Sequence, residues 1–305
     1  MTILNNENDG LYPELIVLFR AVAYCKSIPS GDLINICSPV TDKYDSAKRL
    51  KGALLRWEGL GLFDRDQENI RIKSELLPKK NKVSLDSLTE NLPVITRQLL
   101  LKEENCLPLW DDIIDSEKGN GTSADFVRAI SWVLSQDIYN FPKVWREVES
   151  IESSQVLNGK KIFSSDFRFN AFRHWARYLG FATGESSAFQ IDPTVVVRDS
   201  LPVIFKSEKE IPAHDFLRML NKQLPVFDFG DYRKKVEESL NPSTWRRPSD
   251  GHLSMSLSFA LKRLDMSNVV RLVGKADSGI SFRLTGKNYR TWGGFESVAL
   301  LGDLT

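Results

Sequence analysis

The 305-residue sequence has few cysteines, no long apolar run and almost no net charge. Its three cysteines, Cys25, Cys37 and Cys106, form neither an even set nor a CxxC pair, which disfavours a disulfide framework or a zinc site and fits a reducing compartment. No stretch approaches about 18 uninterrupted apolar residues, and the first residues lack a basic segment followed by an apolar one. We therefore expect a cytoplasmic protein with no membrane partner.

Motifs that would indicate catalysis are also missing. His174, His214 and His252 are widely spaced and form no HExxH, HxE or HxH pattern, and no GxxxxGK[ST] loop occurs. Asp228-Phe-Gly230 spells the magnesium triplet of protein kinases, but the other kinase segments are absent, which indicates a chance turn. We expect a protein that is not an enzyme and has no cofactor or metal.

A formal net charge of +1 means that any affinity for nucleic acid has to come from local basic patches. Hydrophobic residues make up 42% of the chain and charged residues 27%, the balance of a globular protein with real cores. The length favours two or three domains of roughly 100 residues each.

The N-terminal part of the chain shows three helical patterns followed by two short strands. A proline opens the nearly all-apolar segment 13–25, and a Ser-Gly-Asp capping cluster precedes the short pattern 33–37. A third pattern over 42–59 has apolar residues at helical spacing, and alternating residues follow in 62–73. Three helices and a hairpin predict a winged helix.

The C-terminal part repeats this order of elements. Helical patterns over 212–220 and 253–266 precede two strand-like segments, 269–273 and 280–284, which we expect to pair around a glycine-bearing tip. The residues that follow look like a loose tail. The two parts share an architecture but no convincing residue-by-residue repeat.

The segment between them reads as helical, with an aromatic-rich stretch over 163–180 that we expect to be core. The predicted fold class is mainly α with small β-hairpins. The predicted domains are a winged helix over residues 1–78, a helical middle region over 79–205 and a second winged helix over 206–305.

A winged helix places its third helix in the major groove and its hairpin tip against phosphates or the minor groove. Cationic side chains occur at both places in each predicted module, and fewer acids accompany them in the second, which therefore has the more convincing electrostatic footprint. The predicted DNA-binding residues are Lys48, Arg49, Lys51, Arg56, Arg65, Arg71, Lys73, Arg246, Arg247, Lys262, Arg263, Arg271 and Lys275.

Several strings resemble a known family, DpdG. They are Leu4 with Asp9-Gly-Leu11, Ile191-Asp-Pro-Thr194 with Arg198-Asp-Ser-Leu-Pro202, and Leu224-Pro-Val-Phe-Asp228. The resemblance implies an accessory component of the bacterial Dpd systems, which insert deazapurine bases into DNA and restrict DNA that lacks them. It implies ATPase, helicase or nuclease partners and carries over no active-site residue.

Three functions stay open from the sequence. The first is a non-catalytic adaptor of an anti-phage or restriction system that holds duplex DNA. The second is a protein-interaction scaffold that uses its winged helices and the acidic segment 103–117 and does not bind DNA. The third is a metal-dependent nuclease built from scattered residues such as Asp192, Asp199, Glu208 and Lys209.

Overall fold

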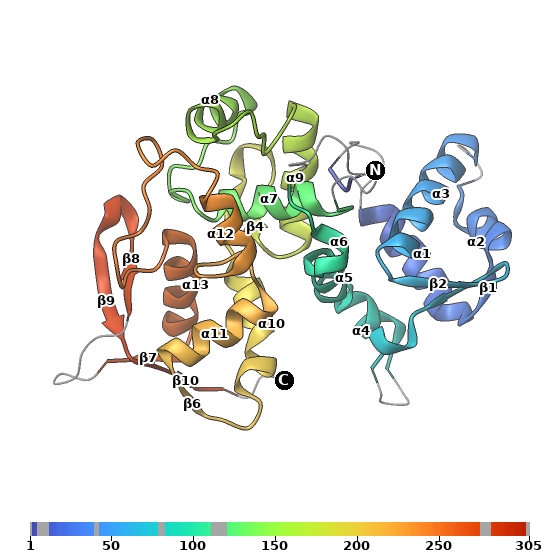
Figure 1. Ribbon diagram of the computed structural model, residues 1–305. Coiled ribbons are helices and arrows are strands. Elements are labelled where there is room, and N and C mark those ends of the chain that lie inside the picture. Colours follow the sequence, from blue (N-terminus) through green and yellow to red (C-terminus); the bar gives the residue numbers. More distant parts are fainter. Residues whose placement is uncertain are drawn as a thin grey trace.

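The computed structural model is mainly helical with small antiparallel sheets (Figure 1). It describes residues 2–4, 12–39, 43–78, 83–110, 121–274 and 282–302. Of the helices in these ranges, none combines the length and the apolar character needed to span a bilayer.

The N-terminal unit, residues 12–78, combines three helices with a three-stranded antiparallel sheet of order β1-β3-β2. The third helix buries Leu50, Leu54 and Trp57, which recur at helical spacing as the sequence predicted. Strand β1 was not predicted, because two residues show no alternation. The elements are α1 (Tyr12–Cys25), β1 (Ile28–Pro29), α2 (Ser30–Cys37), α3 (Lys43–Gly59), β2 (Phe63–Asp66) and β3 (Asn69–Ile72), followed by the short helix η2 (Ser74–Leu76).

The middle region is helical, as predicted, and its aromatic stretch is mostly core. Phe163, Phe169, Phe172 and Trp175 are buried, whereas Phe167 is exposed. The elements are α4 (Leu85–Glu90), α5 (Leu92–Leu101), α6 (Glu103–Cys106), α7 (Ala124–Val133), α8 (Trp145–Gln155), α9 (Asp166–Tyr178), η3 (Ser186–Ala188) and the strand pair β4 (Ala182–Thr183) and β5 (Gln190–Ile191).

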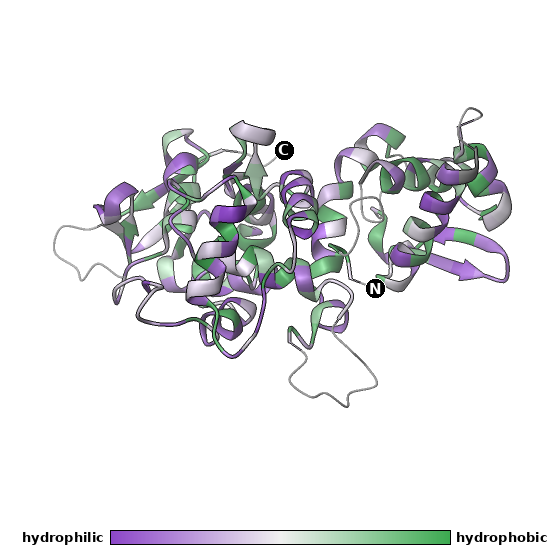
Figure 2. Ribbon diagram, turned by 90° about the horizontal axis from the view of Figure 1, so that it is seen from above, coloured by the Kyte–Doolittle hydropathy of each residue, from purple (hydrophilic) through white to green (hydrophobic). Residues whose placement is uncertain are grey.

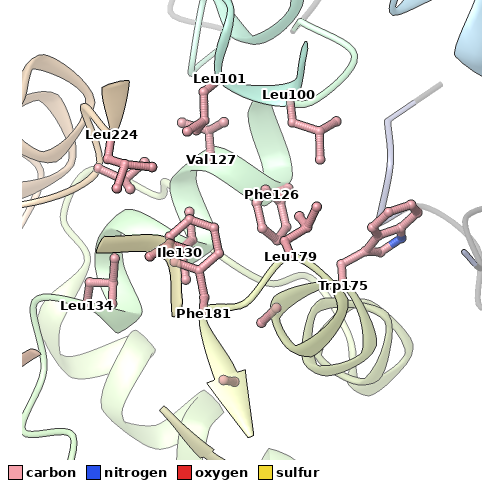
Figure 3. Close-up of a cluster of buried hydrophobic side chains, with 14 of the residues drawn as sticks. Leu100, Leu101, Phe126, Val127, Ile130, Leu134, Trp175, Leu179, Phe181 and Leu224 are labelled. Atoms are coloured by element: carbon pink, nitrogen blue, oxygen red, sulfur yellow. The ribbon is translucent and has the colours of Figure 1, made fainter. Parts of the chain in front are cut away.

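Helix α7 lies at the centre of this core, and every one of its residues is buried. Figure 3 shows Phe126 and Ile130 of this helix among apolar side chains from other elements, including Leu100 and Leu224. The buried carboxylate of Asp125 accepts hydrogen bonds from its neighbour Phe126 N and, at 2.8 Å, from Leu4 N. The helix thereby holds the N-terminal segment as well as the middle region.

The C-terminal unit, residues 194–302, contains four helices and two sheets. The predicted pairing of segments 269–273 and 280–284 is wrong, because β7 pairs with β10 and β8 pairs with β9. The residues expected to form a loose tail supply β9 and β10. The elements are α10 (Thr194–Phe205), β6 (Glu210–Pro212), α11 (Ala213–Gln223), α12 (Asp231–Glu237), α13 (Met255–Met266), β7 (Val270–Val273), β8 (Phe282–Thr285), η4 (Lys287–Tyr289), β9 (Thr291–Phe295) and β10 (Ser297–Leu300).

The N- and C-terminal units have the same sheet topology. The order β6-β10-β7 repeats β1-β3-β2, and in each unit the strand before the second helix pairs with the last strand. The register is also the same. The opposed pairs Ile28–Ile70, Phe63–Ile72 and Asp66–Asn69 correspond to Ile211–Val298, Val270–Leu300 and Val273–Ser297.

This correspondence aligns two short stretches of sequence. Ile28-Pro-Ser-Gly-Asp-Leu33 matches Ile211-Pro-Ala-His-Asp-Phe216, and in both the proline is the N-cap of the helix that follows. The string Leu50-Lys-Gly-Ala-Leu-Leu-Arg-Trp57 matches Leu257-Ser-Phe-Ala-Leu-Lys-Arg-Leu264, and its first, fourth, fifth and eighth residues are buried in both copies. The C-terminal unit therefore repeats the N-terminal one. The sequence similarity between them is seen only when the two sheets are aligned by their strand registers.

The connection between the last two strands of the sheet distinguishes the copies. Two residues, Gln67 and Glu68, join β2 to β3, whereas the β8–β9 hairpin is inserted between β7 and β10. Helix α10 packs on α11 and α13, as α1 packs on α2 and α3. The predicted domain boundary at residue 206 therefore falls between α10 and the helices that it contacts.

Replacement of Asp125 tests the tie between α7 and the N-terminal segment. In Asp125→Ala, two buried backbone N–H groups lose their acceptor, and we expect the free energy of unfolding to fall by about 2 kcal/mol. Urea unfolding of this variant and of Asp250→Ala, an exposed carboxylate, measures the difference. Equal stability of the two variants would contradict the tie.

The buried carboxyl of Glu152 predicts a pH dependence. Burial raises its pKa to about 7, against the hydrogen bonds that it accepts from Ile162 N and Phe163 N. Because the folded state binds this proton more strongly than the unfolded state, stability should fall as pH rises from about 4.5 to 7, by up to about 3 kcal/mol. The stability difference between wild type and Glu152→Gln should follow that fall, while Glu147→Gln, at an exposed position of the same helix, should show no such trend. A pH-independent difference would contradict the raised pKa.

Candidate nucleic-acid interface

Helix α3 carries an exposed stripe on the face opposite its buried one. Lys48, Lys51 and Leu55 are three and four residues apart and therefore lie on one side of the helix, and all three are exposed. In the part of the chain that the structure describes, neither lysine has an ion-pair partner. We call Lys48 and Lys51 the lysine stripe.

The β2–β3 hairpin beside this helix is polar but not strongly basic. The Arg65 guanidinium donates to both carboxylate oxygens of Glu58, at 2.7 and 3.0 Å, and this hydrogen bonding raises the pKa of Arg65. Arg71 forms an ion pair with Asp66 across the two strands. Figure 2 shows the hairpin as a largely hydrophilic arm at the right edge of the molecule. Its two arginines are neutralised within the unit.

The other predicted cations of the N-terminal unit are less accessible. Arg49 is half-buried, with its Nε 3.4 Å from Glu14 Oε1, and Lys73 is half-buried beside Gly61. Arg56 is only 8% exposed, so the expectation that it projects to the surface does not match its position. The lysine stripe is what remains open to a ligand.

The equivalent helix of the C-terminal unit, α13, is covered. From Met255 to Leu264, Arg263 is the one exposed residue, and it forms an ion pair with the buried Asp192. Lys262 is half-buried, with its Nζ 3.1 Å from Asp265 Oδ2. The middle region packs over this helix, with ring centroids of Tyr139 and Phe259 5.9 Å apart. Helix α13, the counterpart of α3, is therefore not an open surface.

The remaining predicted cations of this unit lie elsewhere. Arg246 stacks over the Tyr289 ring at 4.3 Å, and Arg247 lies 3.5 Å from Glu237. Arg271 is exposed on the edge strand β7, and Lys275 lies outside the described residues. The cations predicted to form one basic surface on the second unit therefore lie in different local environments.

One basic surface was not predicted from the sequence. A cavity of about 720 Å³ beside α9 is lined by Lys143, Arg173 and Arg177, with Glu185 as its carboxylate. Burial and the neighbouring Arg177 lower the pKa of Arg173. The spacing of the two arginines, four residues apart on one helix, was the available signal.

Two of the three carboxylates considered for a nuclease, Asp192 and Asp199, have structural partners. Asp192 accepts from Thr194 N at 3.1 Å at the start of α10, and Asp199 lies 2.9 Å from the buried Arg97. Glu208 and Lys209 are exposed in the link between α10 and β6. Within the described ranges, no three His, Cys, Asp or Glu residues are grouped closely enough to hold a metal ion.

A family model described as DpdG-like matches residues 1–278, which reach from the N-terminal unit to just before β8. The chain belongs to the DpdG-like family. The resemblance seen in the sequence is thereby confirmed, and membership makes the protein an accessory component of a Dpd system. Comparisons with curated proteins and with solved structures give no match.

Arg263 offers a test of which cations of this DpdG-like chain are structural. Arg263→Ala leaves the buried Asp192 without its guanidinium, so we expect the free energy of unfolding to fall by about 1 kcal/mol. Lys51→Ala, which removes an unpaired exposed cation, should change stability by less than about 0.5 kcal/mol. If urea unfolding shows the same loss of stability in both variants, the ion pair of Arg263 with Asp192 does not stabilise the fold.

Proposed function

We propose that the protein is a non-catalytic, DNA-engaging adaptor subunit of a bacterial Dpd system, working in the cytoplasm beside ATPase, helicase or nuclease subunits. The N-terminal unit is the DNA contact in this proposal. The observation that supports it best is the lysine stripe, two exposed cations without an ion-pair partner among the described residues, on the third helix of the unit.

The order α1-β1-α2-α3-β2-β3, with sheet order β1-β3-β2, favours a winged helix as the architecture of this unit. In such a module the exposed face of the third helix enters the major groove and the hairpin follows the backbone. Lys48 and Lys51 would contact phosphates, and the polar tip of the β2–β3 hairpin would lie beside them. With two unpaired cations, the expected binding is weak, and its slope of log K against log salt is only about 2.

The second unit has a different role in this proposal. Helix α13, the counterpart of α3, is covered by the middle region, so we propose a second winged helix that begins with α10 and serves as packing scaffold. The partner subunits would then dock on the remaining exposed surface of the protein.

A protein-interaction scaffold is the second candidate, and one observation favours it. Leu55, next to the lysine stripe, is 71% exposed, and Ile36 on α2 and Tyr24 on α1 are 61% and 80% exposed. Exposed apolar side chains are typical of protein interfaces. In this alternative the N-terminal unit contacts another subunit and the purified protein does not bind DNA.

Titration of duplex DNA across salt, with and without divalent ions, separates the candidates. We expect Lys48→Gln/Lys51→Gln to weaken binding and to reduce the slope of log K against log salt by about 2. The control is Lys206→Gln/Lys209→Gln, which removes the same charge from exposed positions in the α10–β6 link.

Other outcomes assign other roles. Unchanged affinity and slope in the stripe variant would overturn the α3 contact, and loss with Lys143→Gln/Arg173→Gln instead would move it to α9. A wild-type protein that ignores DNA supports the scaffold. Cleavage that requires magnesium or manganese supports a nuclease.

A further inference from the structure

Phe229 has an unusual backbone and an unusual environment. Its φ is +67°, in the left-handed region that favours glycine and is costly for an aromatic residue. Its side chain is 48% exposed, with its ring centroid 5.7 Å from that of Phe282. The chain therefore maintains a strained conformation that presents an aromatic ring to solvent.

The turn around Phe229 is fixed from several sides. The Asp228 carboxylate accepts from Ser254 N and Ser254 Oγ at 2.7 and 2.6 Å, which ties the turn to the start of α13. The carbonyl of Asp228 accepts from Asn221 Nδ2 at 2.9 Å, which ties it to α11. A Cβ on Gly230 would lie 2.3 Å from Pro225 O, so glycine is required there. These contacts keep the backbone of Phe229 in its strained left-handed conformation.

The ring of Phe229 stands at a cavity of about 430 Å³ on α11, within the size range of small-molecule sites. Its walls come from α11, from residues 229–231 and from Phe282 of β8. Neither the segment between α11 and α13 that carries α12 nor the β8–β9 hairpin has a counterpart in the N-terminal unit. Two segments that are present only in the C-terminal unit therefore complete the cavity on α11.

Cations line one edge of this cavity. His214, Arg218 and Lys222 lie on successive turns of α11, about 6 Å apart along its axis. Arg218 is paired with Asp215 at 2.8 Å, whereas Lys222 has no ion-pair partner within the described ranges. Asp231 is the carboxylate in the lining. An aromatic wall beside a positive edge suits a planar ring that bears an anionic group.

We propose that this cavity binds a nucleotide, with the base stacked on Phe229 beside Phe282 and the phosphate held by Arg218 and Lys222. The nucleotide is either free or part of a single strand. The site is separate from the lysine stripe and does not depend on duplex binding by the N-terminal unit.

Phe229→Gly is the decisive variant, because it separates a binding role from a structural one. Glycine relieves the left-handed strain, so the midpoint of thermal unfolding should stay the same or rise. Binding of a fluorescein-labelled ten-residue oligothymidylate, followed by anisotropy, should weaken at least about tenfold. Phe229→Tyr, which keeps an aromatic ring, should bind the oligonucleotide as the wild type does. Arg218→Gln/Lys222→Gln should weaken binding and reduce its salt dependence.

Two controls keep the result specific. Phe167→Ala removes an exposed aromatic from α9 and should leave oligothymidylate binding unchanged, as should Lys48→Gln/Lys51→Gln. Competition by thymidine monophosphate indicates a free nucleotide. Retained binding of the oligomer without such competition indicates a single strand, and both results support the site.

Other results contradict the proposal. Unaltered binding in Phe229→Gly, or a wild type that binds neither probe, would overturn it. Binding only of an acidic aromatic peptide would assign the cavity to a protein partner.

Discussion

The complete burial of α7 constrains the rest of the structure. A helix without an exposed face needs neighbours on all sides, and here they come from several parts of the chain. Helices α5, α6 and α9 of the middle region pack on it, and α12 of the C-terminal unit packs on it as well. Asp125 adds the N-terminal segment through Leu4. The middle region and the second unit therefore share a core built around this helix.

Local patterns were sufficient to predict the three helices and the hairpin of the N-terminal unit, though not strand β1. Its helices bury side chains at regular spacing, and its hairpin closes over two residues. The C-terminal sheet required information that a local pattern lacks. Residues 280–284 alternate like a strand next to β7, but the partner of β7 is β10, which follows an inserted hairpin. The choice between the two depends on pairing with β6, far away in the sequence. The repeated register was hidden for the same reason.

The candidate sites divide in the same way. The charges of the predicted DNA-binding residues could be read from the sequence, but their neutralisation could not. The pair of Arg65 with Glu58 spans seven residues, whereas that of Arg263 with Asp192 spans 71. Burial of Arg56 and the left-handed backbone of Phe229 depend on tertiary contacts. The Asp228-Phe-Gly230 turn lacks the other kinase segments, but hydrogen bonds from Ser254 to Asp228 and the positive φ of Phe229 give it a specific geometry.

The order of strands in the two sheets also affects how the protein is made. The first sheet has all its strands once Ile72 has been synthesised, so the N-terminal unit can fold early. In the second sheet, the central strand is β10, and β6 and β7 have no partner until Leu300 has left the ribosome. A nascent chain therefore carries a finished N-terminal unit tethered to an unfinished body for most of its synthesis.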